Sequence, residues 1–251
     1  MTARALVTGA ASGIGQATAR LLAERGAAVA CVDVNSAGLD ETVETIATAG
    51  GRAVPLVADV TDLAAVEAAV AAAVAELGGL DGVANVAGVG DFTGDVTEIA
   101  LDEWARVLAI NLTGAFHVSR ATIPHLRAAG GGAIVNVSSQ FGLVGCLASP
   151  AYCASKAGLI GLTRAMAMDH TSEGIRVNCV CPGPVDTPML AWTVATPELT
   201  ARERARTQGR NLTGRSGRPE EIAATIAFLL SDEVGFMSGS IVAVDGAWTA
   251  G

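Results

Sequence analysis

Seven short apolar segments, separated by longer stretches, constrain the fold more than any other feature of this chain. Nearly all of them are unbroken, whereas a strand with one face in water would alternate polar and apolar residues. Unbroken runs are typical of parallel strands whose two faces are both covered by helices. The segments are Ala5 to Thr8, Ala28 to Val32, Ala53 to Val57, Gly82 to Val86, Ala133 to Val137, Ile175 to Val180 and Ile241 to Val244.

The stretches between these segments carry helical signals. Apolar residues recur at helical spacing from Leu63 to Leu77, and Gly78 and Gly79 mark the end of that helix. The sequence therefore predicts an α/β fold, a Rossmann-type doubly wound sheet of seven parallel strands with helices on both faces. With 251 residues, 51% of them hydrophobic, the chain can cover such a sheet as a single domain, residues 1–251.

One long stretch without a clear strand lies in the last third of the chain. Pro184, Pro188 and Pro197 punctuate it, and its apolar residues include Met189 and Trp192. Long insertions in compact domains are often lids, so we predict a substrate lid over about residues 184–217 within the domain.

Charge and cysteine usage limit the partners and the compartment. The net charge of -9 repels a polyanion, so no nucleic-acid partner is expected, and no apolar run is long enough to predict a membrane span. The five cysteines have neither a disulfide framework nor a zinc-site spacing, and no export signal is visible. We therefore expect a cytoplasmic protein without a metal site. The one basic cluster fits a solvated helix face, with contact to an acidic substrate group as the alternative, and comprises Arg202, Arg204, Arg206 and Arg210.

A glycine-rich turn follows the first predicted strand and opens a helix. Its sequence runs from Thr8 to Gly15, with glycines at positions 9, 13 and 15. Unpaired backbone N–H groups and the helix dipole favour an anion at such a helix start, so this turn suits the pyrophosphate of a dinucleotide. A glycine-rich turn alone is weak evidence, and a simple tight turn is the alternative interpretation.

An acidic residue at the end of the second predicted strand indicates which dinucleotide binds. Asp33 lies 24 residues beyond Gly9, where a carboxylate accepts hydrogen bonds from the adenosine ribose hydroxyls and repels a 2'-phosphate. Neither the glycine turn nor residues 34–36 carry an Arg or Lys that would neutralise such a phosphate. The sequence therefore favours NAD over NADP, with a helix cap or loop acid as the alternative role of Asp33.

A tyrosine and a lysine four residues apart form the candidate catalytic pair. Tyr152 and Lys156 lie on the same side of a predicted helix, and Ser139 precedes Tyr152 by 13 residues at the end of a strand. A phenol has a reference pKa of about 10. A nearby cation and an oxidised nicotinamide ring would stabilise the phenolate, which would bring the pKa toward the range useful for acid/base catalysis.

With these residues in place, the chain closely resembles the short-chain dehydrogenase/reductase family over nearly its entire length. Many ordered matches are far more specific than any single motif. Besides the glycine turn and residues 152–156, they comprise Asp59-Val60, Asn85-Val86-Ala87-Gly88, Asn111, Ser139, Pro182 to Thr187, Arg218 to Glu221 and Asp245-Gly246.

The resemblance implies a role for each matched residue. Tyr152 would exchange the proton, Ser139 would hold the reacting oxygen, and Lys156 would bind the nicotinamide ribose and lower the pKa of the phenol. Asn111 would complete a water-linked proton relay. The expected cofactor contacts are Gly9, Ser12, Gly13, Ile14, Gly15, Asp33, Asp59, Val60, Asn85, Ala87, Gly88, Tyr152, Lys156, Pro182, Gly183, Val185 and Thr187. The resemblance also implies a homotetramer, with a dimer as the second choice.

Three positions left choices open. Ser138 competes with Ser139, which the family spacing to Tyr152 favours, so Ser138 is interpreted as a structural hydroxyl. Many relatives have a second Asn where this chain has Val86, so the anchoring of the sheet is expected to differ there. Cys153 beside Tyr152 is interpreted as a packing residue because no His partner lies in its motif.

The predicted function is an NAD-dependent oxidoreductase that interconverts a secondary alcohol and a ketone, with Tyr152 as general acid/base. Ser139, Phe141, Tyr152, Met189 and Trp192 are the expected substrate contacts in a mainly apolar pocket, and packing of the lid is the alternative role of its apolar residues. One alternative function is reduction of a 3-oxoacyl thioester, although Asp33 counts against the NADPH that such enzymes commonly use. The alternative of another class is a non-catalytic NAD-sensing regulator, against which the intact Ser139, Tyr152 and Lys156 weigh.

Overall fold

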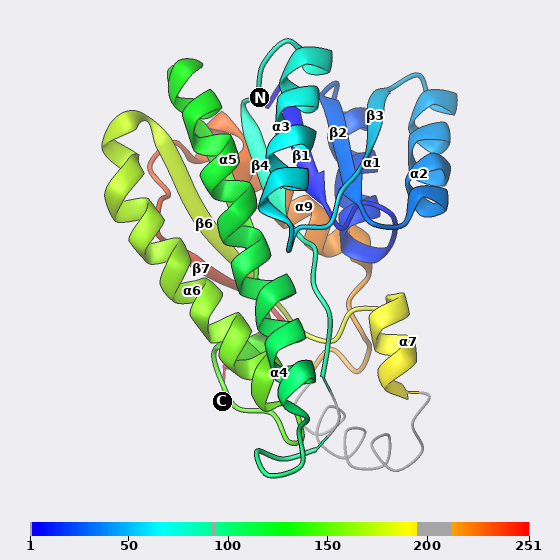
Figure 1. Cartoon of the computed structure of the whole chain (residues 1–251), viewed down its shortest axis with the longest axis vertical. Helices are drawn as coiled ribbons and strands as arrows, with labels where there is room; N and C mark the ends of the chain where they lie inside the picture. The colour runs from blue at the N-terminus through cyan, green and yellow to red at the C-terminus, as the bar shows by residue number, and fades with distance from the viewer. Residues whose placement is uncertain (1, 92–93, 195–211, 251) are drawn as a thin grey trace.

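Seven parallel strands form one sheet in the computed structural model, which describes residues 2–91, 94–194 and 212–250 (Figure 1). The spatial order is β3-β2-β1-β4-β5-β6-β7, and every neighbouring pair runs parallel. The predicted α/β class and all seven predicted strands are therefore confirmed. Their bounds are β1 (Arg4–Thr8), β2 (Ala28–Asp33), β3 (Arg52–Val57), β4 (Gly82–Asn85), β5 (Gly132–Val137), β6 (Ile175–Pro182) and β7 (Ile241–Val244).

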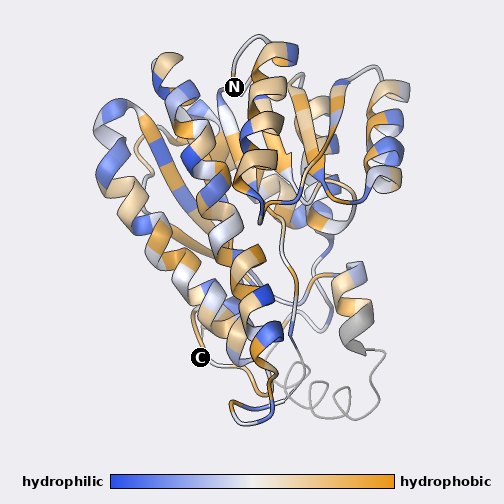
Figure 2. Cartoon of the chain, viewed as in Figure 1, coloured by the Kyte–Doolittle hydropathy of each residue, from blue (hydrophilic) through white to orange (hydrophobic). Residues whose placement is uncertain are grey.

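Helices cover both faces of this sheet. One buried apolar cluster joins the strands to α1, α2 and α9, and a second joins them to α3, α5 and α6. Figure 1 shows α3 and α5 in front of the sheet and α9 behind it, and the strands between them are largely hydrophobic (Figure 2). Because helices cover both faces, an inner strand can be apolar throughout without exposing apolar side chains to water. The helix bounds are α1 (Gly13–Glu24), α2 (Ser36–Thr48), α3 (Leu63–Leu77), α4 (Leu101–Leu108), α5 (Gly114–Ala128), α6 (Pro150–His170), α7 (Pro188–Val194) and α9 (Pro219–Leu230).

The predicted helix from Leu63 to Leu77 is confirmed to the residue, and its ends have local causes. The carboxylate of Asp62 accepts hydrogen bonds from the amides of Ala64 and Ala65, which caps the first turn of α3. Gly78 ends the helix in a left-handed conformation with φ 77°.

The strand order predicts a crevice at the carboxyl ends of the strands, between β1 and β4. The chain leaves β1 toward β2 on one side, and β4 returns on the other side of β1. At such a switch point the loops after neighbouring strands separate, and ligands bind outside the carboxyl ends of the strands. Among the residues that the structure describes, no helix is both long enough and apolar enough to cross a membrane.

Short turns join the helices and strands around this crevice. A π-helical turn, η1 (Ala109–Thr113), connects α4 to α5, and a 3-10 turn, η2 (Gln140–Gly142), follows β5. Two further 3-10 turns lie away from the crevice: η3 (Thr171–Glu173) and η4 (Asp232–Val234).

The predicted lid is described only at its two ends. Residues 195–211, with Pro197 and the four arginines of the basic cluster, lie outside the described residues. Of the described part, α7 follows the loop after β6, and Gly217 bonds back to that loop: its amide donates to Pro184 O and its carbonyl accepts from Asp186 N, both at 2.9 Å. The insertion therefore leaves and rejoins the sheet at one place.

Candidate active site

A cavity of about 960 Å³ occupies the crevice at the carboxyl ends of the strands. Its size is within the range expected of a small-molecule or cofactor site. All but one of the expected cofactor contacts line it: Gly9, Ser12, Gly13, Ile14, Gly15, Asp33, Asp59, Val60, Ala87, Gly88, Tyr152, Lys156, Pro182, Gly183, Val185 and Thr187. Residues from six different loops and helices thus meet in one space.

The glycine turn between β1 and α1 packs too tightly for side chains at two positions. Gly9 has φ 68°, and a Cβ atom there would lie 2.9 Å from the amide nitrogen of Ala87. A Cβ atom on Gly15 would lie 2.0 Å from the carbonyl oxygen of Gly9. The missing side chains let the turn fold over the end of β4 and leave the first amides of α1 facing the cavity, which fits a pyrophosphate.

Asp33, at the end of β2, is held in the wall of the cavity by two backbone amides. Its Oδ2 accepts from Ala11 N at 3.1 Å, and its Oδ1 accepts from Asn35 N at 3.0 Å. The carboxylate therefore cannot turn away from the space beside the glycine turn. Of the described residues that line the cavity, only Lys156 and Arg215 carry a positive charge, and Arg215 forms a two-fold hydrogen-bonded ion pair with Glu221.

Tyr152, Lys156 and Ser139 come together at the other end of the cavity. Tyr152 and Lys156 extend from the first two turns of α6, and the Lys156 Nζ lies 5.6 Å from the centroid of the Tyr152 ring. The buried ammonium donates a hydrogen bond to the carbonyl oxygen of Val137 at 3.0 Å. The side chain of Ser139, just beyond β5, hydrogen-bonds to the phenol.

Burial shifts the pKa of both titratable groups in this set. It raises the pKa of Tyr152 to about 12, because removal of water disfavours the phenolate, and the hydrogen bond from Ser139 opposes this shift. It lowers the pKa of Lys156 to about 8 for the same reason, since the charged form of lysine is the protonated one. Within the protein itself, burial outweighs the hydrogen bond from Ser139. The lowering expected from the sequence includes an oxidised nicotinamide ring and stays a prediction.

The two adjacent serines have different partners. Ser138 Oγ donates to the carbonyl oxygen of Lys156 at 2.8 Å and so braces α6 against the end of β5. Ser139 Oγ accepts from Phe141 N at 3.1 Å and also reaches the phenol. This arrangement supports the choice of Ser139 as the residue beside the reacting oxygen and of Ser138 as the structural hydroxyl.

Asn85 is the one expected cofactor contact that does not line the cavity. Its side chain is buried, and its Nδ2 donates to Asn136 Oδ1 at 2.8 Å and to Ser119 Oγ at 3.1 Å. Asn136 in turn donates to Thr163 Oγ1 at 2.9 Å. The structure therefore does not bring the Asn85 side chain to the cavity: it lies on the face of the sheet covered by α5 and α6 and joins β4 to β5, α5 and α6.

The backbone that follows β4 is anchored at Val86 by a hydroxyl group of β1. The hydroxyl oxygen of Thr8 accepts hydrogen bonds from the amides of Val86 and Ala87 at 3.0 and 3.1 Å. The Val86 side chain packs against the apolar cluster on the face covered by α1. Val86 therefore contributes apolar packing, and Thr8 ties the backbone at this point to β1.

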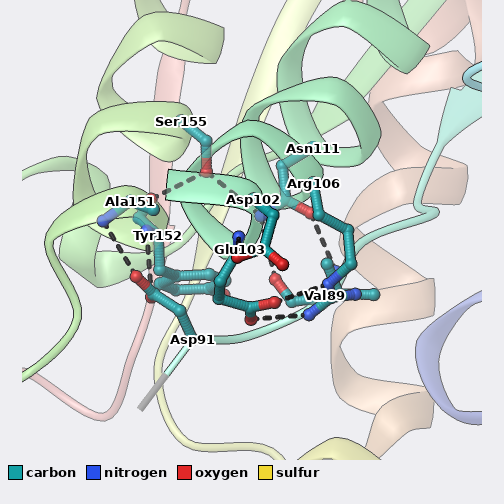
Figure 3. A network of polar contacts seen from close by, with 9 residues as sticks. All are labelled: Val89, Asp91, Asp102, Glu103, Arg106, Asn111, Ala151, Tyr152 and Ser155. Atoms are coloured by element: carbon teal, nitrogen blue, oxygen red, sulfur yellow. Dashed lines mark hydrogen bonds and ion pairs between the residues drawn. The ribbon is translucent and has the colours of Figure 1, made fainter. Parts of the chain in front are cut away.

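Asn111 lies in η1 and holds the loop after β4 rather than touching the phenol. Its Oδ1 accepts from Val89 N at 2.8 Å, and its Nδ2 donates to Val89 O and to Ser155 Oγ (Figure 3). A Cβ atom on Gly88 would lie 3.2 Å from both the Asn111 Oδ1 and the Lys156 Nζ, so the missing side chain leaves room between these two groups. A role for Asn111 in a water-linked relay stays a prediction.

The expected substrate contacts are only partly placed. Phe141 and Met189 line the cavity, and Phe141 makes an edge-on contact with Trp248 at 5.5 Å between ring centroids. Trp192 falls within α7, but its side chain lies outside the described part of the chain. Cys153 Sγ accepts a hydrogen bond from Cys146 N at 3.3 Å, a contact in keeping with a packing role.

Two polar residues of the site were missed in the sequence. Gln140 lies in the cavity wall directly after Ser139, it is 2% exposed, and its Oε1 has no hydrogen-bond partner among the described residues. Its position next to Ser139 was a signal that could have indicated it. Asp91 lies three residues beyond Gly88, is completely buried and bonds to the backbone of Tyr152, and no motif marks it.

Comparisons with known proteins agree with this geometry. A family model described as "Enoyl-(Acyl carrier protein) reductase" matches residues 9–249. Cis-4-hydroxycyclohexanecarboxylate dehydrogenase of Sinomonas cyclohexanicum is 48% identical over 98% of this chain and 96% of its own length. Cyclohexanol dehydrogenase of Acinetobacter sp. (strain SE19) is 39% identical over 98% and 94% of the two chains.

The solved structures agree with the relatives. The crystal structure of levodione reductase superposes with a TM-score of 0.94, at 34% identity, over 99% of this chain and 98% of that one. The family model covers almost the whole chain, and each of these proteins matches it over nearly its full length. The chain is therefore a member of the short-chain dehydrogenase/reductase family of oxidoreductases, as its motifs had indicated.

Proposed function

We propose that the whole chain, residues 1–251, is an NAD-dependent dehydrogenase that interconverts a cyclic secondary alcohol and its ketone. The observation that carries this proposal is the single cavity that joins the glycine turn and Asp33 to Tyr152, Ser139 and Lys156. A dinucleotide docked on the turn would reach from the first amides of α1 toward the Tyr152 hydroxyl within that one space.

Tyr152 is the acid/base in this proposal. In the oxidative direction its phenolate accepts the hydroxyl proton of the alcohol, and in the reductive direction the phenol returns that proton to the carbonyl oxygen. Ser139 donates to the same oxygen and keeps it beside the phenol. The nicotinamide cofactor supplies hydride transfer when bound. Lys156 holds a positive charge at the bottom of the cavity, where Val137 O and the ring of Tyr152 orient it.

Asp33 supports NAD as the preferred dinucleotide. Its carboxylate is fixed by Ala11 N and Asn35 N, and a 2'-phosphate placed beside it would meet a like charge. Arg215, the second cation of the described cavity wall, is already engaged by both oxygens of the Glu221 carboxylate.

The apolar residues of the cavity wall support a compact, mainly apolar substrate. Phe141, Met189 and Leu190 are among the apolar residues that line the cavity, and Gln140, next to Ser139, adds a buried amide to its wall. Relatives named for cyclohexanol and for a hydroxycyclohexanecarboxylate point to the same class of molecule. We therefore propose cyclic secondary alcohols, with or without a further polar substituent, as the substrate class.

The test is Tyr152→Phe, which removes one oxygen atom. With NAD and cyclohexanol, turnover should fall by about 10²- to 10⁴-fold, because the group that moves the proton is lost. NAD affinity, measured by calorimetry, should stay within about threefold, because the dinucleotide is held mainly by the backbone of the glycine turn and by Asp33. Near-normal turnover of this variant would refute the role of Tyr152.

A panel of substrates with the wild-type protein separates the remaining functions. Cyclic alcohols with NAD, a 3-oxoacyl thioester with NADPH, and NAD binding alone are compared. Preference for the thioester and NADPH would replace the proposal with thioester reduction. Tight NAD binding without turnover of any alcohol or ketone would favour the regulatory function.

We also propose that the protein assembles as a homotetramer in the cytoplasm. Large apolar side chains lie exposed on three neighbouring helices, namely Leu101 on α4, Phe116 on α5 and Met168 on α6. An assembly that buries these side chains would remove apolar surface from water. Light scattering should give a mass of about four chains, and a mass of one chain at micromolar concentration would contradict the proposal.

A further inference from the structure

A buried carboxylate lies against the backbone of the helix that carries Tyr152. Asp91, in the loop after β4, has an exposed fraction of 0%. Its Oδ2 accepts a hydrogen bond from Ala151 N at 2.9 Å, and its Oδ1 accepts one from Tyr152 N at 3.0 Å (Figure 3). One side chain thus binds two consecutive amides of the first turn of α6.

The start of α6 depends on this contact because its own sequence supplies no cap. Ser149, at the N-cap position, makes no capping hydrogen bond with its side chain, and Pro150 has no amide hydrogen. The next two amides, of Ala151 and Tyr152, are the ones that Asp91 accepts. The first turn of the helix is therefore held from a point 60 residues away in the chain.

The loop that carries Asp91 is also part of the cavity wall. Ala87, Gly88 and Val89 line the cavity, and Asn111 binds both backbone groups of Val89. Ser155 joins the same network, since its hydroxyl accepts from Asn111 and donates to the carbonyl oxygen of Tyr152. The amide of Tyr152 is thereby bonded to Asp91 of the loop after β4, and its carbonyl is bonded to Ser155 of α6, which Asn111 links to the same loop.

We propose that Asp91 is a positioning residue for the oxidoreductase reaction: its buried carboxylate clamps the amides of Ala151 and Tyr152 and so fixes where the phenol enters the cavity beside Ser139. The inference rests on the proposed function of Tyr152. A local cap such as a serine would hold the helix turn alone, whereas Asp91 links that turn to the loop that forms the cofactor side of the cavity.

The charge of Asp91 has a second effect, on the phenol itself. Burial raises the pKa of Asp91, the two amide hydrogen bonds oppose this shift, and Glu103 on α4 adds to it. Arg106 on α4 pairs with Glu103 through two hydrogen bonds of 2.7 Å. Burial is the main cause that raises the pKa of Tyr152, and the ionised carboxylate of Asp91 adds to it by repelling the phenolate. Lys156 is the cation that faces the phenol.

The test uses the fact that Tyr152 is the only tyrosine of the chain. Its ionisation can be followed directly by the ultraviolet absorbance of tyrosinate, with circular dichroism at each pH to mark alkaline unfolding. Asp91→Asn keeps an acceptor but removes the charge, and Asp91→Ala removes both. The matched control is Asp62→Ala, which deletes the equivalent two-amide cap of α3 outside the cavity wall.

We expect the tyrosinate midpoint to be lower in both Asp91 variants than in the wild type, because a like charge is gone, and lowest in Asp91→Ala, where the loosened turn admits water. With NAD and cyclohexanol, kcat should fall by about 10- to 100-fold in Asp91→Ala and less in Asp91→Asn, since small displacements of a catalytic group are costly. KM for NAD should change by less than about threefold, because the glycine turn is untouched. Asp62→Ala should match the wild type in midpoint and in kcat.

Two results would overturn the inference. One is a tyrosinate midpoint in both Asp91 variants equal to that of the wild type. The other is a kcat of Asp91→Ala equal to that of Asp62→Ala. If Asp91→Ala does not fold, Asp91→Asn is judged by the same two readouts. If the wild type turns over no alcohol or ketone, the proposed function fails, and the tyrosine titration, which needs no turnover, decides the role of Asp91: a lower midpoint in Asp91→Ala than in Asp91→Asn supports the clamp, and equal midpoints in these two variants overturn it.

Discussion

At the scale of single residues, Asp33 is the group to which we assign the proposed choice of NAD over NADP. Two backbone amides hold its carboxylate at the end of β2, so its negative charge has a fixed position in the cavity wall. A fixed charge discriminates more strongly than a mobile one, because no rotation relieves its repulsion from a second anion. In the proposed function, the charge of this one side chain would therefore distinguish two dinucleotides that differ by a phosphate.

Asp33→Asn should weaken that discrimination. The amide keeps one acceptor for a ribose hydroxyl but no longer repels a phosphate, so the ratio of kcat/KM for NAD to that for NADP should fall at least about tenfold. Steady-state kinetics with both cofactors measure the ratio. Asp40→Asn, which makes the same charge change at an exposed position of α2, should leave the ratio unchanged. Equal ratios in the two variants would remove Asp33 from the choice of cofactor.

At the scale of elements, the turn between β1 and α1 is closely packed, both within itself and against the residues that follow β4. The carbonyl group of Gly9 fills the space where a side chain on Gly15 would lie, and the turn also presses on Ala87 at the end of β4. The first turn of α1 therefore packs directly against the backbone of Gly9. Its first amides face the cavity because no side chain separates them from it.

Gly15→Ala tests this element. A Cβ atom 2.0 Å from a backbone carbonyl oxygen forces the turn to move, so we expect a loss of at least about 3 kcal/mol in the free energy of unfolding. NAD affinity should fall with it. Chemical denaturation and calorimetry measure the two effects. Gly235→Ala is the control: its Cβ atom would meet nothing closer than 3.6 Å, and its stability should stay within about 0.5 kcal/mol. Wild-type stability of Gly15→Ala would contradict the described turn.

The elements differ in how far the sequence predicted them. Strands and the helix from Leu63 to Leu77 were predicted because burial on both faces and helical periodicity leave local patterns. The π-helical turn η1 was not predicted, because a π turn depends on how α4 and α5 fit against their neighbours rather than on local preference. The place of the Asn85 side chain was not predicted for a similar reason: its partners, Asn136 and Ser119, come from other elements.

At the scale of the whole molecule, the two buried titratable groups make stability depend on pH. The pKa of Lys156 is about 8 in the folded protein, below its ordinary 10.5, so between these values the unfolded chain binds more protons and stability rises with pH. The pKa of Tyr152 is about 12, above its ordinary 10.0, so over that range the folded protein binds more protons and stability falls with pH. A maximum near pH 10 should follow from these two groups.

Lys156→Met isolates the first effect, because Tyr152 is present in both proteins. From pH 8 to pH 10, the wild type should gain up to about 3 kcal/mol in the free energy of unfolding relative to the variant. Urea denaturation at a series of pH values gives this difference, and alkaline unfolding of both proteins limits the upper end. Parallel curves for the two proteins would show that Lys156 is not desolvated.

The sequence by itself determined the sheet, the side of the sheet on which a dinucleotide would dock, and the placement of Tyr152 and Lys156 on one face of a helix. Each of these follows from residues close together in the chain, through periodicity, strand-end position or helical spacing. The tertiary structure alone decided that Asp91 clamps the helix of Tyr152, that the Asn85 side chain joins β4 to β5, α5 and α6, and that burial raises the phenol pKa. These depend on which distant segments meet and how much water they exclude, and no local pattern of residues carries that information.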